Sequence, residues 1–167
     1  MDAHADWTGA VIVGLVPDLP PRVLDEAARY ADLFQAPLVV AYVDVTRFVT
    51  YEDPDGTPHS APIDMNIASG EAAAEEVRAT AAARFEGRDL RWTVRSLVGD
   101  PAMALKGLAD ELDAPLIVVG TRRRGFGESI REFFTGSVAA RLAHRQHRPV
   151  LVVPLQEPVI DDAPWTE

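Results

Sequence analysis

Short apolar runs recur along the chain, and between them apolar residues return every three or four positions. Runs of about four to eight apolar residues indicate strands buried on both faces, and the three-to-four spacing indicates amphipathic helices. Residues 90–98 alternate apolar and polar positions instead, which predicts a strand nearer a sheet edge. The predicted strands are 10–16, 38–45, 90–98, 115–119 and 149–153.

Four helices are predicted between these strands. A Pro-Pro pair opens the first, since proline is tolerated in a first turn, and Pro37 ends it. An Ala- and Glu-rich segment, 69–84, predicts the second helix, and the Gly-Asp-Pro turn at 99–101 opens the third. The fourth is predicted over residues 137–147.

Strands that alternate with helices predict a parallel sheet covered on both faces. The predicted fold class is α/β: a single-domain, Rossmann-like three-layer fold with a five-stranded parallel sheet, helices on both faces and a flap insertion at about 46–67. We expect one domain over residues 1–167, with a core at about 10–154 and a surface tail at 155–167. The insertion has turn chemistry and a candidate short strand, so it is either a hairpin flap or a mobile loop.

Ligands of such sheets bind beyond the carboxyl ends of the strands, near the point where the strand order reverses. The segment at 120–137, GTRRRGFGESIREFFTGS, leaves a predicted strand there and enters a helix. Gly120 lets the backbone approach a ligand, and a helix start at Gly136-Ser137 favours an anion. Three consecutive arginines add bidentate donors, so a nucleotide phosphate is the expected anion. The alternatives are that Ser137 only caps the helix and that the arginines are only solvated.

The charge distribution favours a small anion over a polyanion. The chain carries 16 Lys and Arg against 26 Asp and Glu, a net charge of -10, which argues against nucleic acid and membranes as partners. Residues 121–148 nevertheless hold seven arginines and two glutamates. Because the chain has no cysteine, no signal-peptide pattern and no apolar run long enough to span a membrane, a cytoplasmic location is expected.

Five sequence words, in their order and spacing, carry a resemblance to a known family. They are VIVG, APLVVAYV, LVGDPAMAL, DAPLIVVGTRRRG and GSVAARLAHRQHRPVLVVP. Over residues 10–154 the chain resembles the universal stress protein family. This resemblance implies an adenine-nucleotide α-hydrolase-like fold and a homodimer paired through the last strand, PVLVV at 149–153.

The nucleotide-binding branch of that family has the pattern Gly, two residues, Gly, nine residues, Gly-Ser/Thr. Gly120 matches the first glycine and Gly136-Ser137 match the final pair. The second glycine position holds Arg123, and twelve residues separate it from Gly136. The family also commonly has an aspartate at the end of the first strand, where this chain has Val16. These departures leave two alternatives, a nucleotide site with a reshaped loop or a branch that has lost the nucleotide.

The resemblance implies a site for an adenine nucleotide, ATP or AMP-like, with or without Mg. The residues it assigns are Gly14, Leu15, Val16 and Val43 around the adenine, Val119 and Gly120 beneath the ribose, Thr121, Arg122 and Arg123 in the charge-neutralising loop, and Gly136, Ser137, Val138 and Ala139 around the phosphates. Plain core packing is the alternative for Val16, Val43 and Val119.

The predicted function is that of a regulatory protein of the stress response, which binds the nucleotide and alters a surface for an unknown protein partner. A Walker lysine motif and a Gly-x-Ser-x-Gly elbow are absent, so no catalytic residue is assigned. The alternatives are a same-fold dimeric interaction module that has lost the nucleotide, and a slow ATPase or phosphotransferase. His144 and His147 have a spacing that can bind metal, but no third ligand is evident and no metal site is expected.

Overall fold

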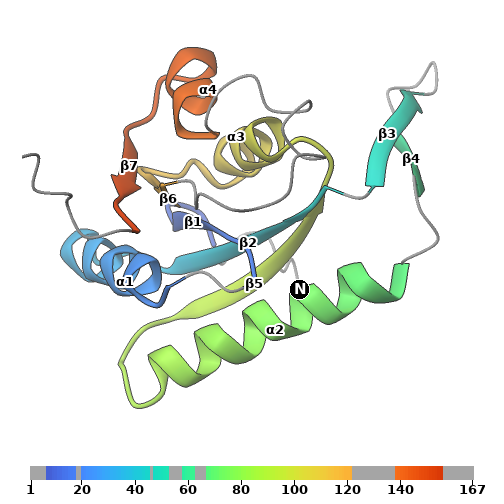
Figure 1. The fold of residues 1–167 in the computed structure, drawn as a ribbon. Coiled ribbons are helices and arrows are strands. Elements are labelled where there is room, and N and C mark those ends of the chain that lie inside the picture. The colour runs from blue at the N-terminus through green and yellow to red at the C-terminus, as the bar shows by residue number, and fades with distance from the viewer. Residues whose placement is uncertain are drawn as a thin grey trace, which may run out of the picture.

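The computed structural model describes residues 7–17, 20–45, 47–52, 58–62, 67–121 and 138–155. Strands and helices follow one another in the predicted order, with an additional pair of strands inside the insertion (Figure 1). In chain order the elements are β1 (Val11–Leu15), α1 (Arg22–Phe34), β2 (Leu38–Asp44), β3 (Arg47–Glu52), β4 (Pro58–Pro62), α2 (Ile67–Phe85), β5 (Trp92–Val98), α3 (Pro101–Leu112), β6 (Ile117–Gly120), α4 (Val138–Arg145) and β7 (Val150–Val153).

The main sheet contains five parallel strands in the order β5-β2-β1-β6-β7. β1 is central, because Val13 pairs with Val40 of β2 on one side and with Val118 of β6 on the other. β5 lies at a sheet edge, which confirms the prediction from its alternating pattern. β6 begins at Ile117 rather than at the predicted Pro115, consistent with the lack of an N–H on proline.

Two helices cover each face of the sheet, with α1 and α2 below it and α3 and α4 above it in Figure 1. Alternate strand residues point to opposite faces, so Val11 and Val13 pack with α1 and α2, whereas Ile12 packs with α3 and α4. β2 is buried along its whole length, as expected of a parallel strand covered on both sides. The predicted three-layer α/β fold is confirmed.

Local sequence sets the ends of the helices. Asp100 caps α3 by accepting a hydrogen bond from the backbone N–H of Met103 at 3.0 Å, and Pro101 follows in the first turn. α1 and α3 are followed by residues with left-handed backbone, Gln35 (φ 52°) and Asp113 (φ 48°). Within the described ranges no helix is long and apolar enough to cross a membrane.

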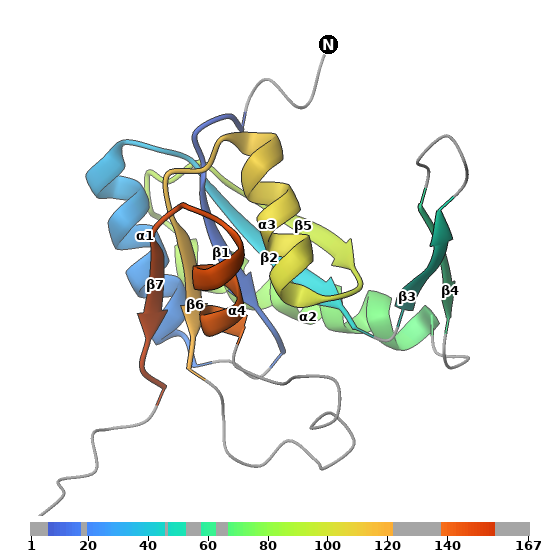
Figure 2. The same ribbon diagram turned by 90° about the horizontal axis from the view of Figure 1, so that it is seen from above.

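The insertion between β2 and α2 contains an antiparallel hairpin, which was one of the two predicted alternatives. β3 and β4 form their own two-stranded sheet, in which Phe48 is opposite Ala61. Figures 1 and 2 both show the hairpin to one side of the main sheet. Since β2 leads directly into it, the hairpin starts from the carboxyl end of the sheet.

Candidate functional site

The carboxyl ends of β1 and β6 mark the point where the strand order reverses. From β1 the chain passes through α1 to β2 on one side, and from β6 it passes through α4 to β7 on the other. Ligands of parallel sheets bind at such a point, because the two connections leave in opposite directions. Gly14 is the register partner of Val119, so the next residues of each strand border this point.

The side chains predicted to surround the adenine and the ribose are divided between the two faces of the sheet. Val43 and Val119 are buried on the α3–α4 face, whereas Leu15 is buried on the α1–α2 face. Val16 is 49% exposed, just beyond the end of β1. Of these four side chains, Val16 is therefore the one that lies open to solvent. The adenine role of Leu15, Val16 and Val43 and the ribose role of Val119 stay predictions.

Gly14 makes room for a core side chain. A Cβ at this position would lie 2.9 Å from Cδ1 of Leu105 and 3.5 Å from Cγ1 of Val119. Leu105 is buried in α3, so the close approach of α3 to β1 is sufficient to explain a glycine here. Its predicted contact with adenine stays a prediction.

Thr121 joins the end of β6 to the segment that follows β7. Its backbone N–H donates to the carbonyl of Val153 at 2.9 Å, and its Oγ1 accepts from the N–H of Leu155 at 2.9 Å. Gly120 and Thr121 are both partly exposed at this end of the sheet. The two hydrogen bonds set the direction in which the chain leaves β6.

α4 is the first described element after the arginine-rich segment. Val138 and Ala139 form its first turn and are partly buried against the core on the α3–α4 face. The first N–H groups of a helix have no partner inside it and carry the positive end of its dipole, which favours an anion. The other predicted phosphate and loop residues, Arg122, Arg123, Gly136 and Ser137, lie outside the described residues.

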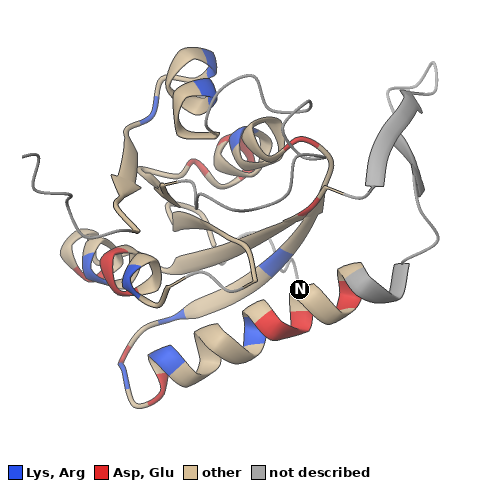
Figure 3. Ribbon diagram, in the orientation of Figure 1, with Lys and Arg blue, Asp and Glu red and all other residues tan. Residues whose placement is uncertain are grey.

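An ion pair that sequence analysis missed connects α3 to α4. Asp100 accepts from Met103 through Oδ1, and its Oδ2 lies 2.5 Å from a guanidinium nitrogen of Arg141. In Figure 3, α4 carries basic residues and no acidic residues, in agreement with its sequence. The Gly-Asp-Pro turn identified Asp100 as the start of a helix, but no sequence signal indicated a partner 41 residues away.

Asp44, at the carboxyl end of β2, is a buried carboxylate that was also not singled out. Its carbonyl accepts from the N–H of Gly99 at 3.1 Å, and a Cβ on Gly70 of α2 would overlap its Oδ2. The carboxylate therefore fits against α2 because residue 70 is glycine. Burial raises the pKa of Tyr42 above its ordinary value, and the negative charge of the nearby Asp44 adds a smaller increase.

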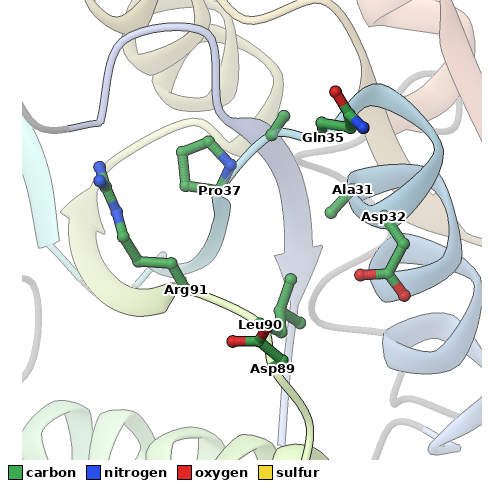
Figure 4. A pocket seen from close by; sticks show the side chains of 8 residues that line it. Ala31, Asp32, Gln35, Pro37, Asp89, Leu90 and Arg91 are labelled. Carbon is green, nitrogen blue, oxygen red and sulfur yellow. The ribbon is translucent and has the colours of Figure 1, made fainter.

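A shallow cleft lies at the opposite, amino end of the strands. It has a volume of about 400 Å³ and lies between the end of α1 and the segments that precede β2 and β5 (Figure 4). Its lining residues are Ala31, Asp32, Gln35, Ala36, Pro37, Asp89, Leu90 and Arg91. None of them belongs to the predicted nucleotide site, which lies at the other end of the sheet.

The described residues contain no group of three or more His, Cys, Asp or Glu side chains that is arranged to hold a metal ion. His144 and Arg145 lie in the last turn of α4, where positive charge interacts favourably with the helix dipole.

Comparisons with known proteins agree with this architecture. Residues 10–154 match the universal stress protein family. A universal stress protein crystallised in complex with cAMP is 28% identical, with a TM-score of 0.57, over 89% of this chain and 98% of that one. A universal stress protein family member from Burkholderia pseudomallei is 26% identical, with a TM-score of 0.59, over 92% of this chain and 99% of its own.

A more distant structure supports the fold alone. It is the universal stress protein from Archaeoglobus fulgidus in complex with dAMP, 22% identical with a TM-score of 0.55, over 88% of this chain and 98% of that one. No match was found among curated proteins. Since the family match spans all five strands of the main sheet, the chain belongs to the universal stress protein family.

Proposed function

We propose that this protein binds an adenine nucleotide at the carboxyl ends of β1 and β6 and acts as a regulatory dimer rather than as a dedicated enzyme. The observation that carries this proposal is the position of α4. It follows directly on Gly136-Ser137 and belongs to the connection that starts where the strand order reverses. A helix start at such a point supplies N–H groups and a dipole for phosphate oxygens.

The known ligands of relatives support the same chemical class. The 28% identical relative was crystallised with cAMP, which has an adenine and one phosphate. In this chain the adenine would lie beyond β1, next to the exposed Val16. The phosphates would contact Gly136, Ser137 and the first turn of α4, and Arg122 and Arg123 would neutralise their charge. Such a site would bind an adenine and a phosphate, which ATP, with or without Mg, and AMP-like nucleotides all contain.

Regulation would act through surfaces that are connected to the site. β7 is an edge strand of the main sheet, and Val152 on it is 42% exposed, which fits a homodimer paired through residues 149–153. Nucleotide binding at α4 would favour one conformation of the surface to which an unknown protein partner binds in the cytoplasm.

Titration calorimetry with ATP, ADP, AMP, cAMP and adenosine tests the proposal, once the purified protein is shown to carry no nucleotide. We expect a micromolar Kd for at least one phosphorylated ligand and at least tenfold weaker binding of adenosine. Gly136→Val should abolish the binding by crowding the phosphate while circular dichroism stays unchanged. Binding of none of the five ligands would contradict the proposal, and ATP turnover that is lost in Ser137→Ala would indicate an ATPase or phosphotransferase instead.

The valine at position 16 favours a second candidate, a dimeric interaction module of the same fold without a nucleotide. Val16 occupies the place of an aspartate that touches the nucleotide in the family, and an exposed valine supplies no hydrogen bond there. A stable dimer with no affinity for any of the five ligands would support this candidate.

A further inference from the structure

Asp100 connects two helix starts through its two carboxylate oxygens. Oδ1 accepts the N-capping hydrogen bond from Met103 of α3 at 3.0 Å, and Oδ2 lies 2.5 Å from the guanidinium of Arg141 on α4. The two side chains are partly buried, with 31% exposure for Asp100 and 20% for Arg141. Partial burial reduces the screening of the pair by water.

Besides this ion pair, α4 is held by apolar contacts, since Val138 and Ala139 pack against the core on the α3–α4 face. It is eight residues long, and Leu142 is its one fully buried side chain. A second, weaker contact to α3 runs from Arg145 to the sulfur of Met103 at 3.7 Å. Isolated helices of this length are unstable in water, so the orientation of α4 depends on such tertiary contacts.

We propose that Asp100 is a positioning residue for the nucleotide site: through Arg141 it holds the N-terminus of α4, and hence the phosphate-binding N–H groups, at a fixed place beside β6. This inference rests on the proposed function. Arg141 lies one turn after Val138, so its guanidinium is tied to the same helix turn that would face the phosphates.

A positioning role for Asp100 and simple charge repulsion predict opposite changes in ATP binding when Asp100 is neutralised. An unpaired carboxylate near bound phosphates weakens their binding, so its neutralisation would tighten ATP binding. A positioning carboxylate has the reverse effect, because its loss frees α4 and weakens ATP binding. The sign of the change in Asp100→Asn therefore distinguishes the two.

Asp100→Asn, Arg141→Met and the double variant are titrated with ATP and with adenosine. Asparagine keeps an Oδ1 that caps α3 but loses the charge that holds Arg141. We expect each single variant to weaken ATP binding about fivefold to tenfold and adenosine binding less than twofold. The double variant should be no weaker than the weaker single variant, because both changes remove one interaction. Arg141→Lys should restore part of the ATP affinity.

Hydrogen exchange of the α4 amides, measured without nucleotide, gives a readout that does not depend on the ligand. In both single variants the amides of residues 142–145, which donate the intrahelical hydrogen bonds of α4, should exchange at least tenfold faster than in the wild type. If the wild type binds no nucleotide but the two variants show this faster exchange, the proposed function is wrong. The contact by which Asp100 positions α4 is then still supported. Unchanged exchange, tighter ATP binding in Asp100→Asn, or equal losses for ATP and adenosine would each overturn the inference.

Asp25→Asn is the matched control. It breaks a second Asp–Arg pair, in which Arg84 of α2 contacts Asp25 of α1 through two hydrogen bonds of 2.5 Å on the opposite face of the sheet. We expect this variant to change neither the ATP affinity nor the exchange of α4. An effect as large as that of Asp100→Asn would show that the loss of any Asp–Arg pair loosens the fold, and would overturn the specific role of Asp100.

Discussion

Two glycines in helices differ in what surrounds them. Gly70, in the first turn of α2, faces the buried Asp44 carboxylate, and an added Cβ would overlap Oδ2. Gly107, in the middle of α3, has nothing within 4 Å of the same added atom. Helix propensity alone favours alanine over glycine by about 1 kcal/mol at both positions. Their packing therefore decides the sign of the substitution.

We expect Gly107→Ala to raise the free energy of unfolding by roughly 0.5–1 kcal/mol. Gly70→Ala should lower it by roughly 1–2 kcal/mol, because the new methyl group displaces a buried carboxylate. Urea denaturation of both variants measures the difference. A gain of stability in Gly70→Ala would contradict the tight contact with Asp44, and Asp44→Ala should be less costly in the Gly70→Ala background than in the wild type.

Val16 is a second position where a single side chain decides the outcome. An aspartate is common there in the family, and the valine is half exposed beyond β1. Val16→Asp should leave the free energy of unfolding within about 0.5 kcal/mol of the wild type, as surface substitutions usually do. If the nucleotide site is retained, the same variant should tighten adenosine and ATP binding severalfold in calorimetry. No change for either ligand would show that the adenine does not approach residue 16.

At the level of elements, carboxylates form hydrogen bonds at both ends of α3. Asp100 caps its start, and Asp110 near its end accepts from Lys106 at 2.6 Å and from Arg148 at 2.6 Å. Arg148 lies between α4 and β7, and its side chain is only 10% exposed. The two carboxylates thus link α3 to both ends of the α4 connection.

The hydrogen bonds from Lys106 and then from Arg148 lower the pKa of Asp110 below its ordinary value of 3.8. A lowered pKa means that the pairing stabilises the fold above about pH 4 and that this contribution is lost as the pH falls through the folded-state value. An NMR titration of the Asp110 carboxyl should therefore show a midpoint below 3.8.

Arg148→Met should raise that midpoint without restoring the ordinary value, because Lys106 still donates. Arg29→Met removes an arginine that pairs with Glu26 on α1 and should leave the Asp110 titration unchanged. A midpoint that does not respond to Arg148→Met would show that the hydrogen bond between Arg148 and Asp110 is absent in solution.

For the whole molecule, the two edges of the main sheet are the natural places for another chain to pair. β7 and β5 have exposed valines, Val152 (42%) and Val98 (36%). Leu151 is a second candidate position on β7 for a test of the dimer. In the structure Leu151 packs against the core on the α1–α2 face, so a charge there would disturb the fold itself.

If the protein forms the proposed dimer through β7, Val152→Lys should convert it into a monomer in sedimentation velocity at the same protein concentration. Its melting temperature should change no more than a surface substitution causes. Val98→Lys, on the other edge, is the control and should stay dimeric. Leu151→Lys should instead lower the free energy of unfolding by roughly 2 kcal/mol or more. A Val152→Lys protein that stays dimeric would place the interface elsewhere.

Much of the fold was predictable because its signals are local. The apolar runs of β1, β2 and β6 and the Gly-Asp-Pro turn before α3 depend only on neighbouring residues, and all appear within a few residues of the predicted positions. The alternating pattern of β5 predicted its edge position correctly, since a strand that is half exposed has one apolar face. The glycine and serine before α4 indicated a helix start from their types alone.

Only the tertiary structure decided which of these residues meet. The pairing of Asp100 with Arg141, and the fit of Asp44 against Gly70, join segments that no local pattern connects. The division of Leu15 from Val43 and Val119 between the two faces depends on strand register, in which a shift of one residue exchanges the faces. Sequence by itself therefore determined the five strands and four helices of the main fold and their order, because these follow from short-range periodicity. The contacts that shape the site depend on how the helices pack against the sheet, so only the tertiary structure determined them.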